Sequence, residues 1–256
     1  MERRTQIRED VVTACRILSH LKLVEAFGHF SARIPGTSRF VISPRRSLAL
    51  VNCVSDLVVA GLDGKKVSGS LEAPLEIHIH SCIYRARPDV GAIARTHSFA
   101  TSVLAALGRG VGVVHDFGAI LLGDIPLFPR SELIETKKLG DELAAFIGSR
   151  SGALLRGNGT AIVGSDAMHA CLRAIFIEES AALQLEALQA GQPRFLTPEE
   201  IRARGRQLLG SAYLLRAWEH YKHEALRHTV HAKPKREVMV KSDRRKLARF
   251  STGGLP

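Results

Sequence analysis

The stretch "PLEIHIHSCIYRARPDVGAIARTHS", residues 74–98, changes its pattern halfway along. Its first part predicts a helix from about Pro74 that stops before Pro88, because proline suits the first turn of a helix and cannot continue one. The second part contains "VGAIART", an apolar run that is typical of a buried β-strand. A helix followed closely by a buried strand indicates an α/β protein.

The predicted helix carries polar side chains at a regular spacing. Glu76, His80 and Tyr84 are four residues apart, so a helix places them on one face. A carboxylate beside an imidazole can be an acid/base pair or two metal ligands, although a buried histidine bonded to the backbone is the simpler alternative. His78 lies about 200° around the helix from Glu76, so "HIH" does not predict a chelating pair.

The predicted strand ends at His97, a place where catalytic groups tend to be presented. Arg95 is two residues earlier, and side chains two apart in a strand point the same way. An arginine in an apolar run needs an anion, which is either Glu76 or a carboxylate or phosphate of a substrate. A structural salt bridge and a binding role are equally open from this pattern.

A second stretch, "LLRGNGTAIVG" at residues 154–164, predicts two apolar strands joined by a tight turn. Asn158 stands between two glycines in that turn. Asparagine tolerates the left-handed backbone region, so a turn role is the simplest interpretation of this residue by itself.

The rest of the chain alternates between helical and strand-like patterns. Residues 7–26 predict an opening helix, residues 28–44 a hairpin around a Pro-Gly turn, and residues 56–69 a second strand pair. Further on, the pattern predicts a short helix at 98–107, extended chain at 111–129, a helix capped by Ser131 that ends at Gly148, and helices at 166–191, 197–209 and 212–226. The tight turns imply antiparallel pairing.

Length and composition favour one domain. The chain has 256 residues, of which 45% are hydrophobic, and this is enough for a full core. No apolar run is long enough to cross a bilayer, and the first residues lack the features of a signal peptide. The four cysteines are scattered; Cys15, Cys82 and Cys171 predict buried, reduced thiols in a cytoplasmic protein.

The net charge of +11 is partly local. Eight Lys and Arg residues lie between Lys233 and Arg249, against two acids, so we expect a domain at 1–228 and a basic tail or arm at 229–256. Such a tail could bind nucleic acid, but it has one aromatic residue and no nucleic-acid-binding motif, so a solvated tail or a subunit-packing arm is preferred. The basic body suits a small anionic substrate.

Taken in order, these blocks resemble the class II aldolase/adducin family over roughly residues 7–225. The block "E…H…IYRARPDV" is the most specific. The "GHxSxR" start is similar to the branch of decarboxylases and related enzymes on hydroxy or oxo acids, whereas sugar-phosphate aldolases tend to carry Asn in place of His29. The resemblance implies a three-layer α/β/α fold with a central, mainly antiparallel sheet, and commonly a homotetramer with active sites at subunit interfaces.

Enzymes of the family hold a divalent metal, often zinc, with three histidines, and use a glutamate on the preceding helix as acid/base. Carried over by position, the glutamate is Glu76 and one histidine is His97. The other two metal positions are occupied by Arg95 and Asn158. One of the three histidines is therefore present.

The two replacements argue against the family's metal. Arginine stays protonated and cannot be a ligand. Its charge at about 4 Å from an ion would cost on the order of 4 kcal/mol at an effective dielectric constant near 20. We expect no functional metal site; the alternative is a divalent Zn, Fe or Mn ion held weakly through His97 and Glu76.

The preferred prediction is a metal-independent carbon–carbon lyase or decarboxylase that acts on a small anionic, possibly aromatic, hydroxy- or oxo-acid. Arg95 and Asn158 would stabilise the oxyanion, and Glu76 and His97 would move the proton. The alternative is a non-catalytic, adducin-like interaction scaffold with a basic tail. No membrane association is expected. Substrate contacts are expected from His29, Ser31, Ser43, His80 and Tyr84.

Overall fold

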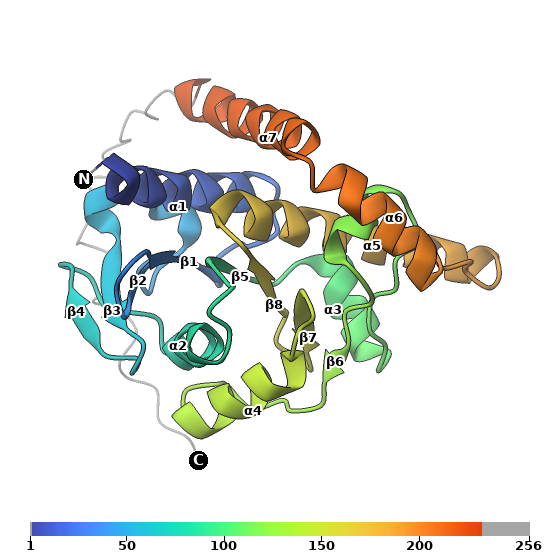
Figure 1. The fold of residues 1–256 in the computed structure, drawn as a ribbon, viewed down its shortest axis with the longest axis horizontal. Helices are drawn as coiled ribbons and strands as arrows, with labels where there is room; N and C mark the ends of the chain where they lie inside the picture. The colour runs from blue at the N-terminus through green and yellow to red at the C-terminus, as the bar shows by residue number, and fades with distance from the viewer. Residues whose placement is uncertain (1, 232–256) are drawn as a thin grey trace, which may run out of the picture.

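A computed structural model describes residues 2–231 of the chain (Figure 1). The last helix in it, α7, runs over Ser211–His231 and so continues past the expected domain boundary at residue 228. The remainder of the predicted basic tail, from residue 232 onward, lies outside the described residues.

Eight strands form one sheet in the order β4-β3-β2-β1-β5-β8-β7-β6. Every neighbouring pair is antiparallel except β6 and β7, which are parallel. The hairpin at 28–44 and the strand pairs at 56–69 and 152–164 form as predicted, because each has a tight turn rich in glycine. The strands are β1 His29–Ile34, β2 Arg39–Ile42, β3 Val58–Gly61, β4 Lys66–Ser68, β5 Ala92–Thr96, β6 Leu127–Phe128, β7 Gly152–Leu155 and β8 Thr160–Gly164.

Helices cover both faces of the sheet, which gives three layers. Figure 1 shows α1, α5 and α7 on one side of it and α2 and α4 on the other. This confirms the expected three-layer fold around a mainly antiparallel sheet. No described helix is long and apolar enough to span a membrane. The helices are α1 Glu2–His20, α2 Ile77–Ala86, α3 Phe99–Ala106, α4 Lys137–Ile147, α5 Ala167–Ala190, α6 Pro198–Leu208 and α7.

The sheet separates two apolar cores. Phe30 and Ala94 belong to the core shared with α1 and α5, while Ile93 belongs to the core shared with α2 and α4. Because side chains alternate along a strand, Ile93 shares its face with Arg95 of the same strand and with its paired residues, Ser31 of β1 and Val163 of β8. Cys15, Cys82 and Cys171 are buried free thiols, as predicted.

Helix starts and ends differ from the expectations in three places. The opening helix ends at His20 rather than at residue 26, because the backbone turns left-handed at Lys22, with φ 56°. The second helix begins at Ile77, and Glu76 is its N-cap with ψ 31°, so Pro74 lies outside it. Helix α4 begins after Thr136, whose hydroxyl accepts a hydrogen bond from the Leu139 N–H at 3.3 Å.

The predicted Ser131 cap is wrong for a tertiary reason. The N–H of Ile134 is hydrogen bonded to Glu76 at 3.3 Å, so the chain at this residue contacts the site instead of forming a helical turn. The expected extended chain at 111–129 is also interrupted, by a 3₁₀ helix at Phe117–Leu121. Its buried residues pack against α5 and α6, and this packing overrides the local strand preference.

Candidate functional site

The site lies where the middle of the sheet meets the start of α2. His29 of β1 pairs with Arg95 of β5, and Arg95 pairs on its other side with Ala161 of β8. Residues directly opposite in antiparallel strands share a face, so His29 and Arg95 both point toward α2. The β7–β8 turn brings Asn158 to the same place.

Glu76 is the centre of the polar contacts. Its Oε1 accepts hydrogen bonds from Nδ2 of Asn158 at 2.8 Å and from the N–H of Ile134 at 3.3 Å. Its Oε2 pairs with the guanidinium of Arg95 at 3.2 Å and lies 3.8 Å from Nε2 of His29. Both carboxylate oxygens are therefore already held by groups of the chain.

Arg95 lies behind Glu76, with no exposed surface. It also donates to the carbonyl oxygen of Thr96 at 2.9 Å, while its Nε has no hydrogen-bond partner among residues 2–231. A Cβ atom at Gly159 would stand 2.0 Å from the Thr96 oxygen and 2.7 Å from a guanidinium nitrogen. The second glycine of "GNG" is thus required by close packing as well as by its φ of 69°.

Burial and charge shift the protonation of the site. Burial by itself would raise the pKa of Glu76, but the imidazole of His29, the charge of Arg95 and the Ile134 N–H outweigh it, and the pKa falls well below its ordinary value. Burial first, and then the charge of Arg95, lowers the pKa of His97 to about 4. Near neutral pH the site therefore combines an ionised carboxylate with a neutral imidazole.

A cavity of about 550 Å³ opens in front of these groups. Three of the predicted catalytic residues, Glu76, His97 and Asn158, line it, and so does His29. These residues come from four separate parts of the chain that only the sheet and its turns bring together. A cavity of this size accommodates a small organic acid.

The other predicted residues do not line this cavity. Arg95 is separated from it by Glu76, so any effect it has on a substrate is electrostatic. Ser31, Ser43, His80 and Tyr84 are at most 1% exposed. Ser31, His80 and Tyr84 form a buried layer beneath His29, whereas the hydroxyl of Ser43 accepts a hydrogen bond from the N–H of Phe30 at 3.0 Å. His80 and Tyr84 share one helix face, as predicted, since both contact the hydroxyl of Ser31, but Glu76 is the N-cap that precedes the helix. Their predicted roles in catalysis and binding stay predictions.

Sequence reasoning missed part of the cavity wall. Arg45 and Arg46 lie at one side of it, and Phe27, Leu75 and Leu133 supply apolar surface. Arg46 is paired with Asp56 at 2.8 Å, yet its buried Nε has no partner among the described residues. Two arginines directly after a strand that ends beside the predicted site were the available signal in the sequence.

The donor set differs from the three-histidine site that the resemblance implies. Within residues 2–231, no three His, Cys, Asp or Glu side chains are grouped so that they could hold a metal ion. A buried guanidinium and an amide stand at the other two positions, and both oxygens of Glu76 are engaged. These residues do not fit the family's metal.

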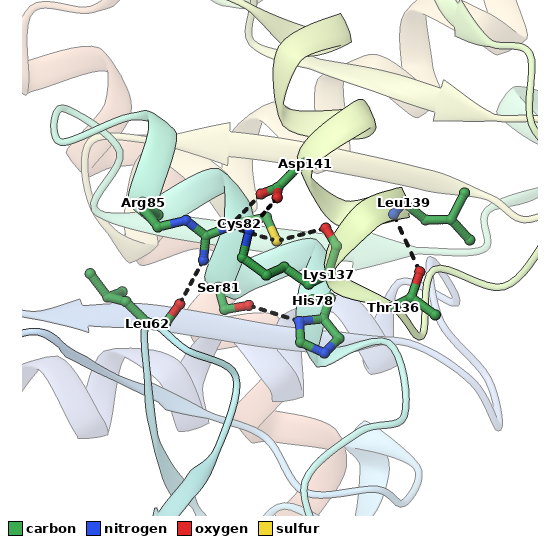
Figure 2. Close-up of polar contacts among 9 residues, drawn as sticks. All are labelled: Leu62, His78, Ser81, Cys82, Arg85, Thr136, Lys137, Leu139 and Asp141. Atoms are coloured by element: carbon green, nitrogen blue, oxygen red, sulfur yellow. Dashed lines mark hydrogen bonds and ion pairs between the residues drawn. The ribbon is translucent and has the colours of Figure 1, made fainter.

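Helix α2 has a second polar face, which contacts α4 (Figure 2). Arg85 pairs with Asp141 there and donates to the carbonyl oxygen of Leu62 at 3.0 Å. His78 is 3.4 Å from the hydroxyl of Ser81 on this face. The two histidines of "HIH" therefore lie in different environments.

Comparison with known proteins identifies the family of the chain. Residues 9–185 match the class II Aldolase and Adducin N-terminal domain. The chain is 31% identical over 230 residues to 3,4-dihydroxyphthalate decarboxylase of Arthrobacter keyseri, covering 83% of this chain and 91% of that protein. It is 30% identical over 243 residues to the decarboxylase tropJ of Talaromyces stipitatus, covering 81% and 90%.

Solved structures share the fold. The L-fuculose 1-phosphate aldolase from Glaciozyma antarctica superposes with a TM-score of 0.76 at 22% identity, over 89% of this chain and 91% of that one. Together with the domain match and the decarboxylase relatives, this shows that the chain belongs to the class II aldolase and adducin family.

Proposed function

We propose that the protein is a metal-independent decarboxylase of a small aromatic hydroxy acid. The observation that carries this proposal is the ionised Glu76, held by Arg95 and Asn158 at the wall of a cavity that also contains the neutral His97. Relatives about 30% identical are named decarboxylases, one of them of a dihydroxylated aromatic dicarboxylic acid.

The cavity suits such a substrate. Apolar side chains of Phe27, Leu75 and Leu133 can contact a ring, and the guanidinium of Arg46 can bind a carboxylate with two parallel hydrogen bonds. Its pairing with Asp56 is through one terminal nitrogen, and 32% of the side chain remains exposed, so the terminal nitrogens of the guanidinium are the atoms that would contact the substrate. We expect Arg46→Ala to raise KM about tenfold or more with a smaller change in kcat, as for a charge-assisted contact of about 1.5–3 kcal/mol.

The proposed chemistry begins with proton transfer from the substrate hydroxyl to Glu76. Glu76, with His97 beside it, then delivers this proton to the carbon that carries the carboxylate, which makes a β-oxo acid. The carbon–carboxylate bond breaks, CO₂ leaves, and the electron pair moves onto the oxygen as a phenolate. The phenolate takes one proton from water, so the net reaction consumes one proton and releases one CO₂.

Arg95 and Asn158 take the electrostatic part of this proposal. The guanidinium of Arg95 lies behind the carboxylate of Glu76 and is fully buried. Its positive charge therefore acts on an anion in the cavity through a region with little water. Asn158 donates to Glu76 at 2.8 Å and its amide also lines the cavity. A metal ion would have to displace these contacts.

Turnover in the presence of a chelator tests the proposal. Full-length protein without a polyhistidine tag is assayed for CO₂ release from hydroxybenzoates and dihydroxyphthalates, with and without chelator, after elemental analysis. We expect turnover that the chelator does not change. Stoichiometric zinc, iron or manganese that is lost together with activity would overturn metal independence. If no acid binds or reacts, the interaction scaffold is the better conclusion.

A double substitution tests the assignment of the metal positions. Arg95→His with Asn158→His restores the three-histidine pattern of the family, and we expect the variant to bind one zinc per chain with tetrahedral donors. The single Asn158→His variant is the control, since Arg95 would still repel the ion. Absence of metal from a folded double variant would show that these positions do not correspond.

We also propose that the site lies at a subunit interface of a homotetramer. Phe27 is 76% exposed at the cavity wall, and Phe99, two residues after His97, is 81% exposed. Large aromatic side chains left in water beside a site mark a contact surface. Light scattering should give four chains per particle, and Phe27→Ser with Phe99→Ser should shift it to smaller species.

A further inference from the structure

A chain of hydrogen bonds leads from the cavity wall into the core beneath α2. It begins at His29, whose Nδ1 is 2.6 Å from Nε2 of His80. It continues from Nδ1 of His80 to Oγ of Ser31 at 2.6 Å, and from there to the hydroxyl of Tyr84 at 2.7 Å. The last three residues are at most 1% exposed, so His29 is the member of the chain that meets the cavity.

The protons of this chain can be ordered in two ways, because a neutral imidazole has one N–H and one bare nitrogen. In the inward order, His29 donates to His80, which donates to Ser31, and the serine donates to Tyr84. In the outward order, Tyr84 donates to Ser31, the serine donates to His80, and His80 donates to His29. The outward order leaves the proton of His29 on Nε2, whereas the inward order leaves that nitrogen bare.

Both ends of the chain favour the outward order. Within residues 2–231, the hydroxyl of Tyr84 has Ser31 as its only hydrogen-bond partner, so the inward order would leave its buried proton unpaired. A stranded buried donor costs about 1–3 kcal/mol. At the other end, Nε2 of His29 faces Oε2 of Glu76 at 3.8 Å, and an ionised carboxylate can only accept. A nitrogen without a proton there would place its lone pair against a lone pair of the carboxylate oxygen, and the two would repel each other.

We infer that His29 is a catalytic residue held as the neutral Nε2–H tautomer, and that it donates this hydrogen to the substrate oxygen on which negative charge develops. His80 and Ser31 are positioning residues that fix the tautomer, and Tyr84 supplies the first donor. The catalytic part rests on the proposed function, whereas the tautomer follows from the hydrogen bonds alone.

One oxygen atom in the cavity, beside the line that joins Nε2 of His29 and Oε2 of Glu76, can bridge these two residues. At 3.8 Å the two facing atoms are too far apart to hydrogen bond, but a hydroxyl oxygen can lie about 2.8 Å from each. That hydroxyl donates to Glu76 and accepts from His29. When its proton passes to Glu76, the oxygen keeps the electron pair, and the hydrogen bond from His29 becomes stronger.

Burial keeps this imidazole neutral. The pKa of His29 is lowered first by burial and then by the charge of Arg95, and the facing Glu76 opposes both only in part. Burial also lowers the pKa of His80 well below its ordinary value. A neutral imidazole N–H beside a developing oxyanion acts as an electrophile, a task that a metal ion performs in other enzymes.

Nitrogen NMR of the full-length protein tests the tautomer directly. Histidine is labelled with ¹⁵N, and the His29 and His80 signals are assigned from His29→Gln and His80→Gln variants. We expect both rings to be neutral at pH 7.5, with the proton on Nε2 and Nδ1 bare. A proton on Nδ1 of His29, or a charged ring, would overturn the inference.

Two substitutions test the catalytic role. His29→Leu removes the donor, and we expect kcat to fall 10²–10³-fold, about the effect of losing one oxyanion donor, with little change in KM. His29→Gln keeps an N–H donor and should lose less. His78→Leu, on the outer face of α2, is the matched control and should keep kcat.

The outcomes separate the two proposals. A folded His29→Leu variant with unchanged kcat contradicts the role of His29 while decarboxylation stands. If the wild-type protein releases no CO₂ from any acid, decarboxylation fails, and the NMR result then decides the tautomer by itself.

Discussion

Helix α2 presents two polar faces with similar residue types and different physical settings. On the inner face, His80 and Tyr84 are enclosed and every hydrogen bond is between protein groups. On the outer face, Arg85 and Asp141 pair across to α4 with more than a third of each side chain exposed (Figure 2). Water can replace a lost partner on the outer face, but nothing can do so on the inner one.

This difference indicates which polar side chains can have a defined chemical role. An enclosed group has a fixed partner and orientation, so its proton position is determined by its neighbours. An exposed pair is screened and mobile, and it contributes mainly to solubility and local order. The predictions below test the contrast, beginning with the largest effect.

Breaking the inner ion pair should have the largest effect. Glu76→Gln leaves the fully buried guanidinium of Arg95 without a counter-charge, and we expect the free energy of unfolding to fall by about 3–5 kcal/mol. Urea denaturation measures it. The double variant with Arg95→Met should recover part of the loss, because no buried charge remains. A loss below about 1 kcal/mol for Glu76→Gln would show that this pair is solvated.

Acidification should destabilise the inner face next. The folded-state pKa values of His29, His80 and His97 are lowered, mainly by burial, and that of His97 is about 4. Between about pH 6.5 and pH 4 the unfolded chain binds more protons than the folded one, so stability falls as the pH falls. Urea titrations at several pH values should show it.

The histidines of "HIH" provide the control for this pH dependence. His80→Gln should flatten the slope of stability against pH in that window, since it removes a fully enclosed imidazole. The pKa of His78 is lowered by burial too, but this ring is only partly enclosed, so His78→Gln should change the slope less. Equal slopes for the two variants would contradict the contrast between the faces.

Removing one hydroxyl should have a smaller effect. Tyr84→Phe deletes a buried hydrogen bond of 2.7 Å and should lower the free energy of unfolding by about 0.5–1.5 kcal/mol. Tyr221→Phe is the matched control, because that hydroxyl contacts Glu179 at 3.4 Å and is only part-buried. The midpoint temperature of thermal unfolding should therefore be lower for Tyr84→Phe than for Tyr221→Phe.

The outer ion pair should matter least. Asp141→Asn removes the partner of Arg85 and Lys137 at the surface, and we expect a loss below about 1 kcal/mol. The loss should shrink further in 1 M salt, since exposed charges are screened there. If the free energy of unfolding falls by more than about 2 kcal/mol and salt does not reduce this loss, the pair behaves as a buried ion pair and the contrast between the two faces is wrong.

Much of the fold followed from local pattern. The hairpins formed as predicted because their turns contain the residues that the backbone requires, and α6 begins at Pro198, directly after its N-cap Thr197. Predictions failed where a residue distant in the sequence hydrogen bonds to a backbone group that was expected to form a helix. Ile134 gives its N–H to Glu76, so the helix that Ser131 was expected to cap begins at Lys137.

The residues of the site also fall into those that the sequence predicted and those that it did not. Glu76, His97 and Asn158 were identified from motif positions, and the fold brings them to one cavity. Arg45 and Arg46 were missed because exposed arginines are common, and their place beside the cavity depends on where β2 ends. His80 and Tyr84 were expected at the cavity, but their side chains face the sheet and contact Ser31, beneath His29.

The sequence by itself determined the family and the mainly antiparallel sheet between helices, and it led to the prediction that Arg95 and Asn158 stand in place of two metal histidines. These follow from residue type and spacing, which are local properties. Tertiary structure alone decided that Arg95 lies behind Glu76 and that His29 faces the cavity at the end of a buried hydrogen-bond chain. Strand register and burial join residues far apart in the chain, and burial controls which side chains water can reach.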